Sequence, residues 1–270
     1  MKTVEKSFTL FSIVFTFAAL VALPTPAPEL NEPLTDFITY ALLLMGLGAF
    51  VLVTWTEEEP AAQTELTREI PVTAFDTLDV SGAFKVLVTR GEVPRVVLRG
   101  TPRQVNGLRV RQTGPALVLS SRDWLTWWQG TALITVTMPA LRLLDASGVG
   151  QVRVEGFEAF AHTTLDVSGA ADVTFTGRGE RLSVEVAGAA RLTLQGEAER
   201  LDADLSGACS LSAFSFAAPD VSLELSGVCS AQVRAQTRLR ADLSGASSLQ
   251  YRGQPRLEIQ TTGASSVTQA

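Results

Sequence analysis

Carboxylates recur at one fixed place along this chain, and they are the first residues whose spacing could support chemistry. Each stands three residues before a glycine, in a short phrase that reads LDVSGA or ADLSGA in its clearest copies. The series, closed by an amide, is Asp79, Asp145, Asp166, Glu185, Asp204, Glu224, Asp242 and Gln260. Grouped carboxylates can act as acid and base, hold a cation or attract a basic partner. The elements that position them decide between these roles.

The repeat around the carboxylates predicts a β-solenoid. Its glycines are Gly148, Gly169, Gly188, Gly207, Gly227, Gly245 and Gly263, at steps of 21, 19, 19, 20, 18 and 18 residues. Within each unit apolar and polar residues alternate, which indicates stacked β-rungs rather than helical repeats. We expect an all-β, right-handed parallel β-helix with a single strand path, about 18–21 residues per rung and roughly eight to ten rungs over residues 71–270.

Each glycine suits a sharp bend because it has no Cβ, and small residues after it, such as Ala170 and Ala189, should fit the inside of that bend. An eighth copy of the phrase, at 78–83, lies 66 residues before Gly148, about three further periods. The less regular strands of residues 72–137 should begin the solenoid, with one face extended by an insertion.

The composition narrows the possible functions. The chain has 270 residues, and from residue 66 onward it carries twenty basic and twenty acidic side chains, so it has no basic excess for nucleic acid. Two cysteines and one histidine exclude a zinc ribbon. We predict no cofactor, no metal and no catalytic residue.

The N-terminus predicts a membrane anchor over residues 1–59, followed by a linker over 60–70. Residues 7–23 and 37–55 are two uncharged apolar runs; the second is long enough to span a bilayer and the first is at the short limit. They form either a membrane hairpin or a signal peptide followed by one span. Lys2 and Lys6 favour an N-terminus inside the cell, and both arrangements then return the solenoid to the cytoplasm. We expect the bacterial inner membrane, with the side of the solenoid left open.

Three further features each have a plain and a functional interpretation. A predicted loop contains three tryptophans, Trp124, Trp127 and Trp128. They form either a hydrophobic lid or a contact for a ligand, glycan or bilayer. Cys209 and Cys229 occupy equivalent positions in consecutive units. They are either small buried thiols or, in an oxidising compartment, a disulfide. The polar segment 260–270 is a candidate cap of the last rung, and filament growth remains possible if its edge stays open.

Three phrases carry a resemblance to a known family. FDTLDVSGAFKV at 75–86, VTMPALRLLDASGVG at 136–150 and the repeated LxLSGA resemble the head-GIN domain family of auto-transporter adhesin heads, mostly from Bacteroidetes-like bacteria. The resemblance covers residues 70–270. It implies a parallel β-helix with a surface or envelope role, and it implies no catalytic residues. The two apolar runs depart from the single export signal expected for that family.

We therefore predict a membrane-anchored, non-enzymatic binding module with an adhesin-like role. Its candidate interaction surface is Asp145, Asp166, Glu185, Asp204, Glu224, Asp242, Trp124, Trp127 and Trp128. In-register rungs would place the carboxylates about 4.8 Å apart, where they repel unless solvent, arginines, a cation or a basic partner compensates. A protein or glycan partner is possible. The alternative is a membrane-tethered cytoplasmic scaffold of the bactofilin type. A carbohydrate-active enzyme is least supported, since a straight ladder is no deep groove.

Overall fold

The computed structural model describes residues 65–121 and 132–270. The predicted membrane segments 7–23 and 37–55, and the three clustered tryptophans, lie outside the described residues. Within the described ranges there is no helix long and apolar enough to cross a membrane. The helix found there, α3 (Pro102–Gly107), has six residues, begins with a capping box between Thr101 and Gln104, and buries Val105.

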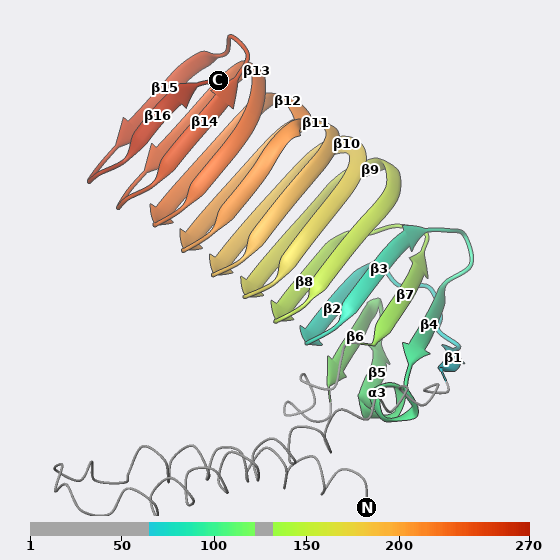
Figure 1. Cartoon of the computed structure of the whole chain (residues 1–270). Helices are drawn as coiled ribbons and strands as arrows, with labels where there is room; N and C mark the ends of the chain where they lie inside the picture. Colours follow the sequence, from blue (N-terminus) through green and yellow to red (C-terminus); the bar gives the residue numbers. More distant parts are fainter. Residues whose placement is uncertain (1–64, 122–131) are drawn as a thin grey trace, which may run out of the picture. The chain divides into compact units, whose positions relative to one another are not determined.

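The prediction of an all-β solenoid is confirmed, with about seven turns rather than eight to ten. Four long strands, β9 (Gln151–Gly169), β10 (Asp172–Gly188), β11 (Arg191–Gly207) and β12 (Ser210–Gly227), each run from one corner glycine to the next. They stack in parallel, and Figure 1 shows them side by side along the solenoid axis. The stack ends with β13 (Ser230–Leu243), β14 (Ser248–Arg252), β15 (Arg256–Thr261) and β16 (Ser266–Gln269).

The early copy of the repeat lies next to the later ones, not three rungs away. β2 (Thr77–Gly82) pairs in parallel with β8 (Leu143–Gly148), so that Gly82 stands opposite Gly148. β3 (Lys85–Arg90) pairs with β9 in the same way. The residues between the two copies do not form rungs between them, because they lie on the other edge of the early copy, at the end of the solenoid.

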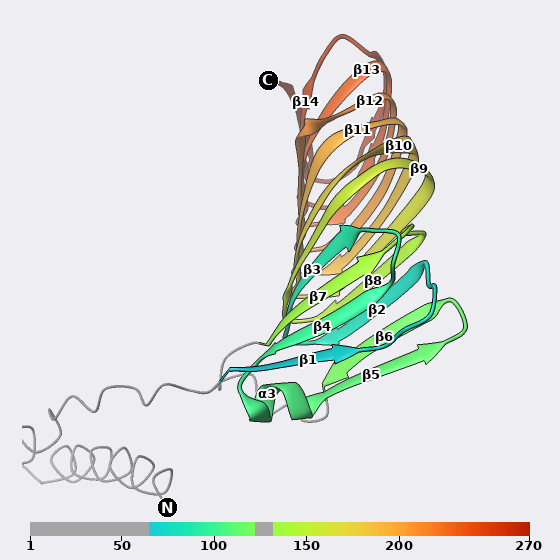
Figure 2. The same ribbon diagram turned by 90° about the vertical axis from the view of Figure 1, so that its right-hand side faces the viewer.

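That closed end combines parallel and antiparallel strands, as Figure 2 shows. β6 (Ala116–Ser121) and β7 (Leu133–Met138) pair in parallel with β2 and β3. β5 (Leu108–Thr113) and β4 (Arg95–Gly100) then add antiparallel to β6 and β7. β1 (Leu66–Ile70) adds antiparallel to β4, so the folded domain extends into the stretch predicted as a linker.

Alternation along the strands produces the core. Every second side chain points inward and stacks on its counterpart in the next turn, as in the column Leu165, Val184, Ala203 and Leu223. Phe175 and Phe216 are among the largest fully buried side chains. Each fully buried Leu, Val or Phe stabilises the fold by about 1.5–3 kcal/mol, and no turn could bury these side chains alone. Within the described residues no buried side-chain nitrogen or oxygen lacks a hydrogen-bond partner.

The corner glycines stack directly on one another, and this stacking explains the residue type. Gly207 has a φ of 101°, and a Cβ added to it would lie 2.6 Å from the carbonyl oxygen of Gly188. The sequence predicted that the residue after the glycine fits the inside of the bend, and this prediction is wrong. Its amide bonds to the previous glycine, as Ala170 N does to Gly148 O at 2.9 Å, and its side chain is exposed; Val149 and Val228 are 65% and 66% exposed there.

Candidate functional site

The predicted carboxylates form one continuous column on the outer face of the solenoid. Strand register places Asp79 opposite Asp145, then Asp166, Glu185, Asp204, Glu224, Asp242 and finally Gln260 in successive turns. We call these seven carboxylates the acidic column. A second outward column lies two residues further along each strand and consists mainly of hydroxyls. Its members are Ser81, Ser147, Ser168, Ala187, Ser206, Ser226, Ser244 and Thr262.

Most arginines near the acidic column pair with carboxylates outside it. Arg200 and Arg181 pair with Asp202 at 2.8 and 3.9 Å, and neither pairs with the column. Arg238 pairs with Glu258 at 2.6 Å. Within the described residues, the column's ion pair is the one from Arg240 Nη2 to Asp242 Oδ2, at 3.5 Å. The other six carboxylates of the column therefore have no ion pair within the described residues.

Two carboxylates of the column near the closed end, Asp79 and Asp145, have raised pKa values. Burial raises the pKa of Asp79, and burial together with the charges of Asp79 and Asp166 raises the pKa of Asp145. At the other end a shallow hollow of about 380 Å³ is lined by Asp204, Glu224 and Asp242 on one side and by Ser226, Ser244 and Thr262 on the other. Among the residues that the structure describes, no cluster of three His, Cys, Asp or Glu could hold a metal ion.

The two cysteines occupy an interior corner position. Cys209 and Cys229 are buried free thiols, and each Sγ lies about 3 Å from the carbonyl oxygen three residues earlier, at 3.0 Å from Ser206 O and 3.1 Å from Ser226 O. Ser247 and Ser265 hold the same position in later turns and make the same contact. Burial is the first cause that raises the pKa of the Cys209 thiol. The two thiols therefore pack as small buried side chains, in the same position as the serine hydroxyls of later turns.

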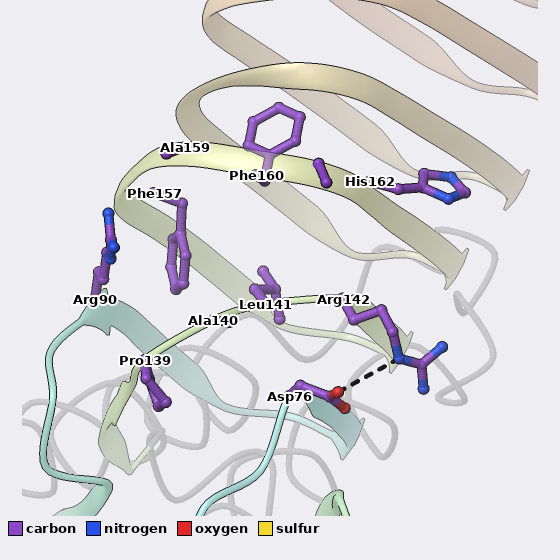
Figure 3. A pocket seen from close by; sticks show the side chains of 11 residues that line it. Asp76, Arg90, Pro139, Ala140, Leu141, Arg142, Phe157, Ala159, Phe160 and His162 are labelled. Carbon is purple, nitrogen blue, oxygen red and sulfur yellow. Dashed lines mark ion pairs between the residues drawn. The ribbon is translucent and has the colours of Figure 1, made fainter.

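A notch that sequence reasoning missed lies where the solenoid meets its closed end (Figure 3). β9 pairs with β3 as far as Glu155, and with β8 from Thr164 onward, so residues 156–163 have no strand partner on that edge. The loop 139–142 passes below them and leaves a cavity of about 230 Å³. His162 is exposed at the rim, and its Nε2 forms a hydrogen bond with Ser183 Oγ at 2.9 Å. No repeat signal marks this notch, because it arises from a missing strand.

These observations define the class of protein: an all-β parallel solenoid that presents long, flat, polar faces. Residues 74–255 match the family described as putative auto-transporter adhesin, head GIN domain. The chain belongs to this family, and the resemblance seen in its sequence is thereby confirmed.

Solved structures share the fold at low sequence identity. A putative adhesin from Bacteroides fragilis superposes with a TM-score of 0.70 at 20% identity, covering 77% of this chain and 98% of that one. A putative adhesin from Parabacteroides distasonis gives 0.61 at 14% identity, with 77% and 98% covered. A structure from the same organism described as a putative lipid binding protein gives 0.61 at 16%, with 76% and 96% covered. A search of curated proteins found no match.

Proposed function

We propose that this protein is a non-enzymatic binding module of the cell envelope, anchored to the inner membrane by its N-terminal apolar segments. Family membership and the adhesin descriptions of similar structures support a binding role. The observation that carries the proposal is the acidic column, in which six of seven carboxylates have no ion pair within the described part of the chain. Natural surfaces intersperse charges of both signs, so a one-sign row indicates an electrostatic partner.

The partner that fits this face is a protein surface rich in Lys or Arg. Carboxylates repeating at each turn, about 4.8 Å apart, match the spacing of cationic side chains on an extended segment or a second sheet. The neighbouring hydroxyls can donate and accept hydrogen bonds with the same partner. Catalysis is not supported, because the carboxylates lie in a straight row rather than facing one another across a substrate.

Binding to a cationic probe tests the role of the face. Full-length protein in lipid nanodiscs is titrated with poly-lysine, with empty nanodiscs as the blank. Neutralising four column members together (D166N, E185Q, D204N and E224Q) should weaken binding at least about tenfold. A matched variant neutralises four exposed or half-buried carboxylates outside the column, Glu158, Asp172, Glu180 and Glu199. Equal loss in both variants would mean that only net charge matters and would refute a dedicated face.

Protease digestion of intact spheroplasts tests the placement of the domain. The protein carries a C-terminal tag after the solenoid. Cutting near residues 57–65 releases the tag from the membrane and shows that the protease reaches the segment before the solenoid. Loss of the membrane-attached tag in intact spheroplasts supports an envelope-binding role. Protection until lysis refutes it and favours the second candidate, a membrane-tethered cytoplasmic scaffold.

One observation favours that second candidate. β15 pairs with β13 and β16 pairs with β14, and neither has a partner on its other edge among the described strands. Leu257, on β15, is 44% exposed. An open edge with an apolar side chain can pair with another chain. A scaffold would show length-distributed filaments of purified protein by electron microscopy, and substitution L257K would abolish them.

A further inference from the structure

The notch beneath residues 156–163 combines an apolar interior with a cationic rim. Leu141, Phe157 and Phe160 line it, and they are 3%, 3% and 8% exposed, so they belong to the core and border the cavity at the same time. Figure 3 shows Phe157 and Leu141 directed into the space between β9 and the loop below. An apolar group that enters this space would contact the small part of these side chains that remains accessible.

The rim carries more positive than negative charge. Arg142 is held in place, with Nε 3.5 Å from Asp76 Oδ2 and Nη2 donating to Thr77 Oγ1 at 3.0 Å. Arg90, at the end of β3, has no ion pair or side-chain hydrogen bond within the described ranges. Because Asp76 pairs with Arg142, the guanidinium of Arg90 remains available to a ligand. Arginine binds carboxylates by two parallel hydrogen bonds, which favours this class of anion.

We propose that the notch binds a small monocarboxylate that carries one aromatic ring or a short branched chain. The apolar part would pack against Phe157 and Leu141, and the carboxylate would pair with Arg90. The cavity of about 230 Å³ is below the roughly 300–1,000 Å³ of pockets for drug-sized ligands, which favours a small ligand. The proposal does not depend on the acidic column, since none of its carboxylates lines the notch.

Equilibrium dialysis of 3-phenylpropionate tests the ligand class. Full-length protein in lipid nanodiscs is compared with empty nanodiscs, and the uncharged 3-phenylpropan-1-ol serves as the matched probe. We expect saturable binding of the acid to one site, and at least about tenfold weaker binding of the alcohol. Absence of saturable binding, or equal binding of the two probes, would overturn the proposal.

Two variants test the location. R90Q removes the available guanidinium at an exposed position and should weaken binding of the acid about tenfold while leaving the alcohol unchanged. A159W should fill the notch, because Ala159 lines it, and abolish binding; A187W, at an exposed position in another turn, is its control. Unchanged affinity in R90Q, whose melting temperature confirms its fold, would overturn the site. The fourfold variant of the acidic column should bind the acid like the wild type, so the two proposals fail separately.

Discussion

At the scale of single residues, two constraints act on every corner glycine. The backbone has a positive φ that residues with a Cβ rarely adopt, and the space where the Cβ would lie is taken by the preceding turn. At Gly169 that neighbour is the carbonyl oxygen of Gly148, 2.7 Å from an added Cβ. The same oxygen accepts the amide of Ala170, so it cannot move aside without losing a hydrogen bond.

Substitution G207A should therefore lower the free energy of unfolding by about 2–4 kcal/mol, through strain at a positive φ and a clash with Gly188. Guanidinium denaturation of the full chain measures it. Gly107 is the control, because a Cβ added there meets no heavy atom within 4 Å, so G107A should change stability by less than about 0.5 kcal/mol. Similar effects at both positions would refute the stacking explanation.

The position of Cys209 requires a small side chain that can donate to a carbonyl. Because Ser247 makes the equivalent bond, to Ser244 O at 2.8 Å, C209S should keep stability within about 1 kcal/mol. C209L should cost about 1–3 kcal/mol, since the interior corner has no room for a longer side chain. Thermal denaturation of both variants checks the prediction. A large loss in C209S would instead indicate a role for the sulfur itself, such as a bond to Cys229.

Asp145 links the column to pH. Burial, followed by the charges of Asp79 and Asp166, raises the pKa of this carboxyl above its ordinary 3.8. The folded state therefore binds the proton more readily than the unfolded state, and ionised Asp145 opposes folding at neutral pH. Its contribution becomes more favourable as the pH falls from neutral through the raised pKa toward 3.8.

Substitution D145N should accordingly raise the melting temperature at about pH 7, and the difference from the wild type should shrink as the pH falls to about 4. Melting curves followed by circular dichroism at several pH values provide the measurement. An advantage that stays constant with pH would show that the charge of Asp145 is not the cause.

At the scale of elements, parallel strands in exact register turn single carboxylates into a continuous charged column. Neighbouring unit charges at this separation repel by about 1 kcal/mol in water, and the column has several such pairs in series. Apart from Arg240, no cation within the described residues pairs with it. The strands stay in register because each inward Leu, Val or Ala sits on its counterpart in the next turn, and a shift of one residue would expose them all.

Salt should therefore stabilise the domain. Raising the ionic strength from about 0.05 to about 0.5 M shortens the Debye length below the spacing of distant charges and should raise the melting temperature. The variant D166N, E185Q, D204N, E224Q should be more stable at low salt and respond less. The variant neutralised at Glu158, Asp172, Glu180 and Glu199 should keep the wild-type response. If both variants respond alike, the repulsion is general rather than confined to the column.

At the scale of the whole domain, the two ends of the solenoid differ. The N-terminal end is closed by antiparallel strands, with β5 on β6 and β4 on β7. At the C-terminal end, β15 and β16 each pair on one edge, and Ile259 and Val267 are only partly buried against the core. In a stack where each turn contacts only its neighbours, the end turn has half of the stabilising interface.

Hydrogen exchange should therefore be uneven along the axis. Amides of β15 and β16 should exchange at least about tenfold faster than those of β11, which has a strand partner on both sides. Exchange followed by mass spectrometry of the full chain resolves these peptides. Uniform exchange from β8 to β16 would mean that the solenoid opens as one cooperative unit.

The sequence by itself determined the repeating part of this protein. A period near twenty, alternation within it and a glycine at each corner were enough for the solenoid, for the register of Asp166 with Glu185 and for the small interior position of Cys209. These are local patterns, because each turn repeats the contacts of the one before. The side chain after the glycine was predicted wrongly, because its direction depends on which way the corner amide bonds.

Only the tertiary structure decided what happens where the repeat is interrupted. Gly82 lies opposite Gly148 although 66 residues separate them, and the intervening strands lie on the other edge of β2 and β3. Alternation of apolar and polar residues does not determine which distant strands pair, because any two strands with this alternation could pair. The notch at 156–163 follows from the same interruption. Its Arg90, Leu141 and Phe157 come from three separate segments, and only the fold brings them together.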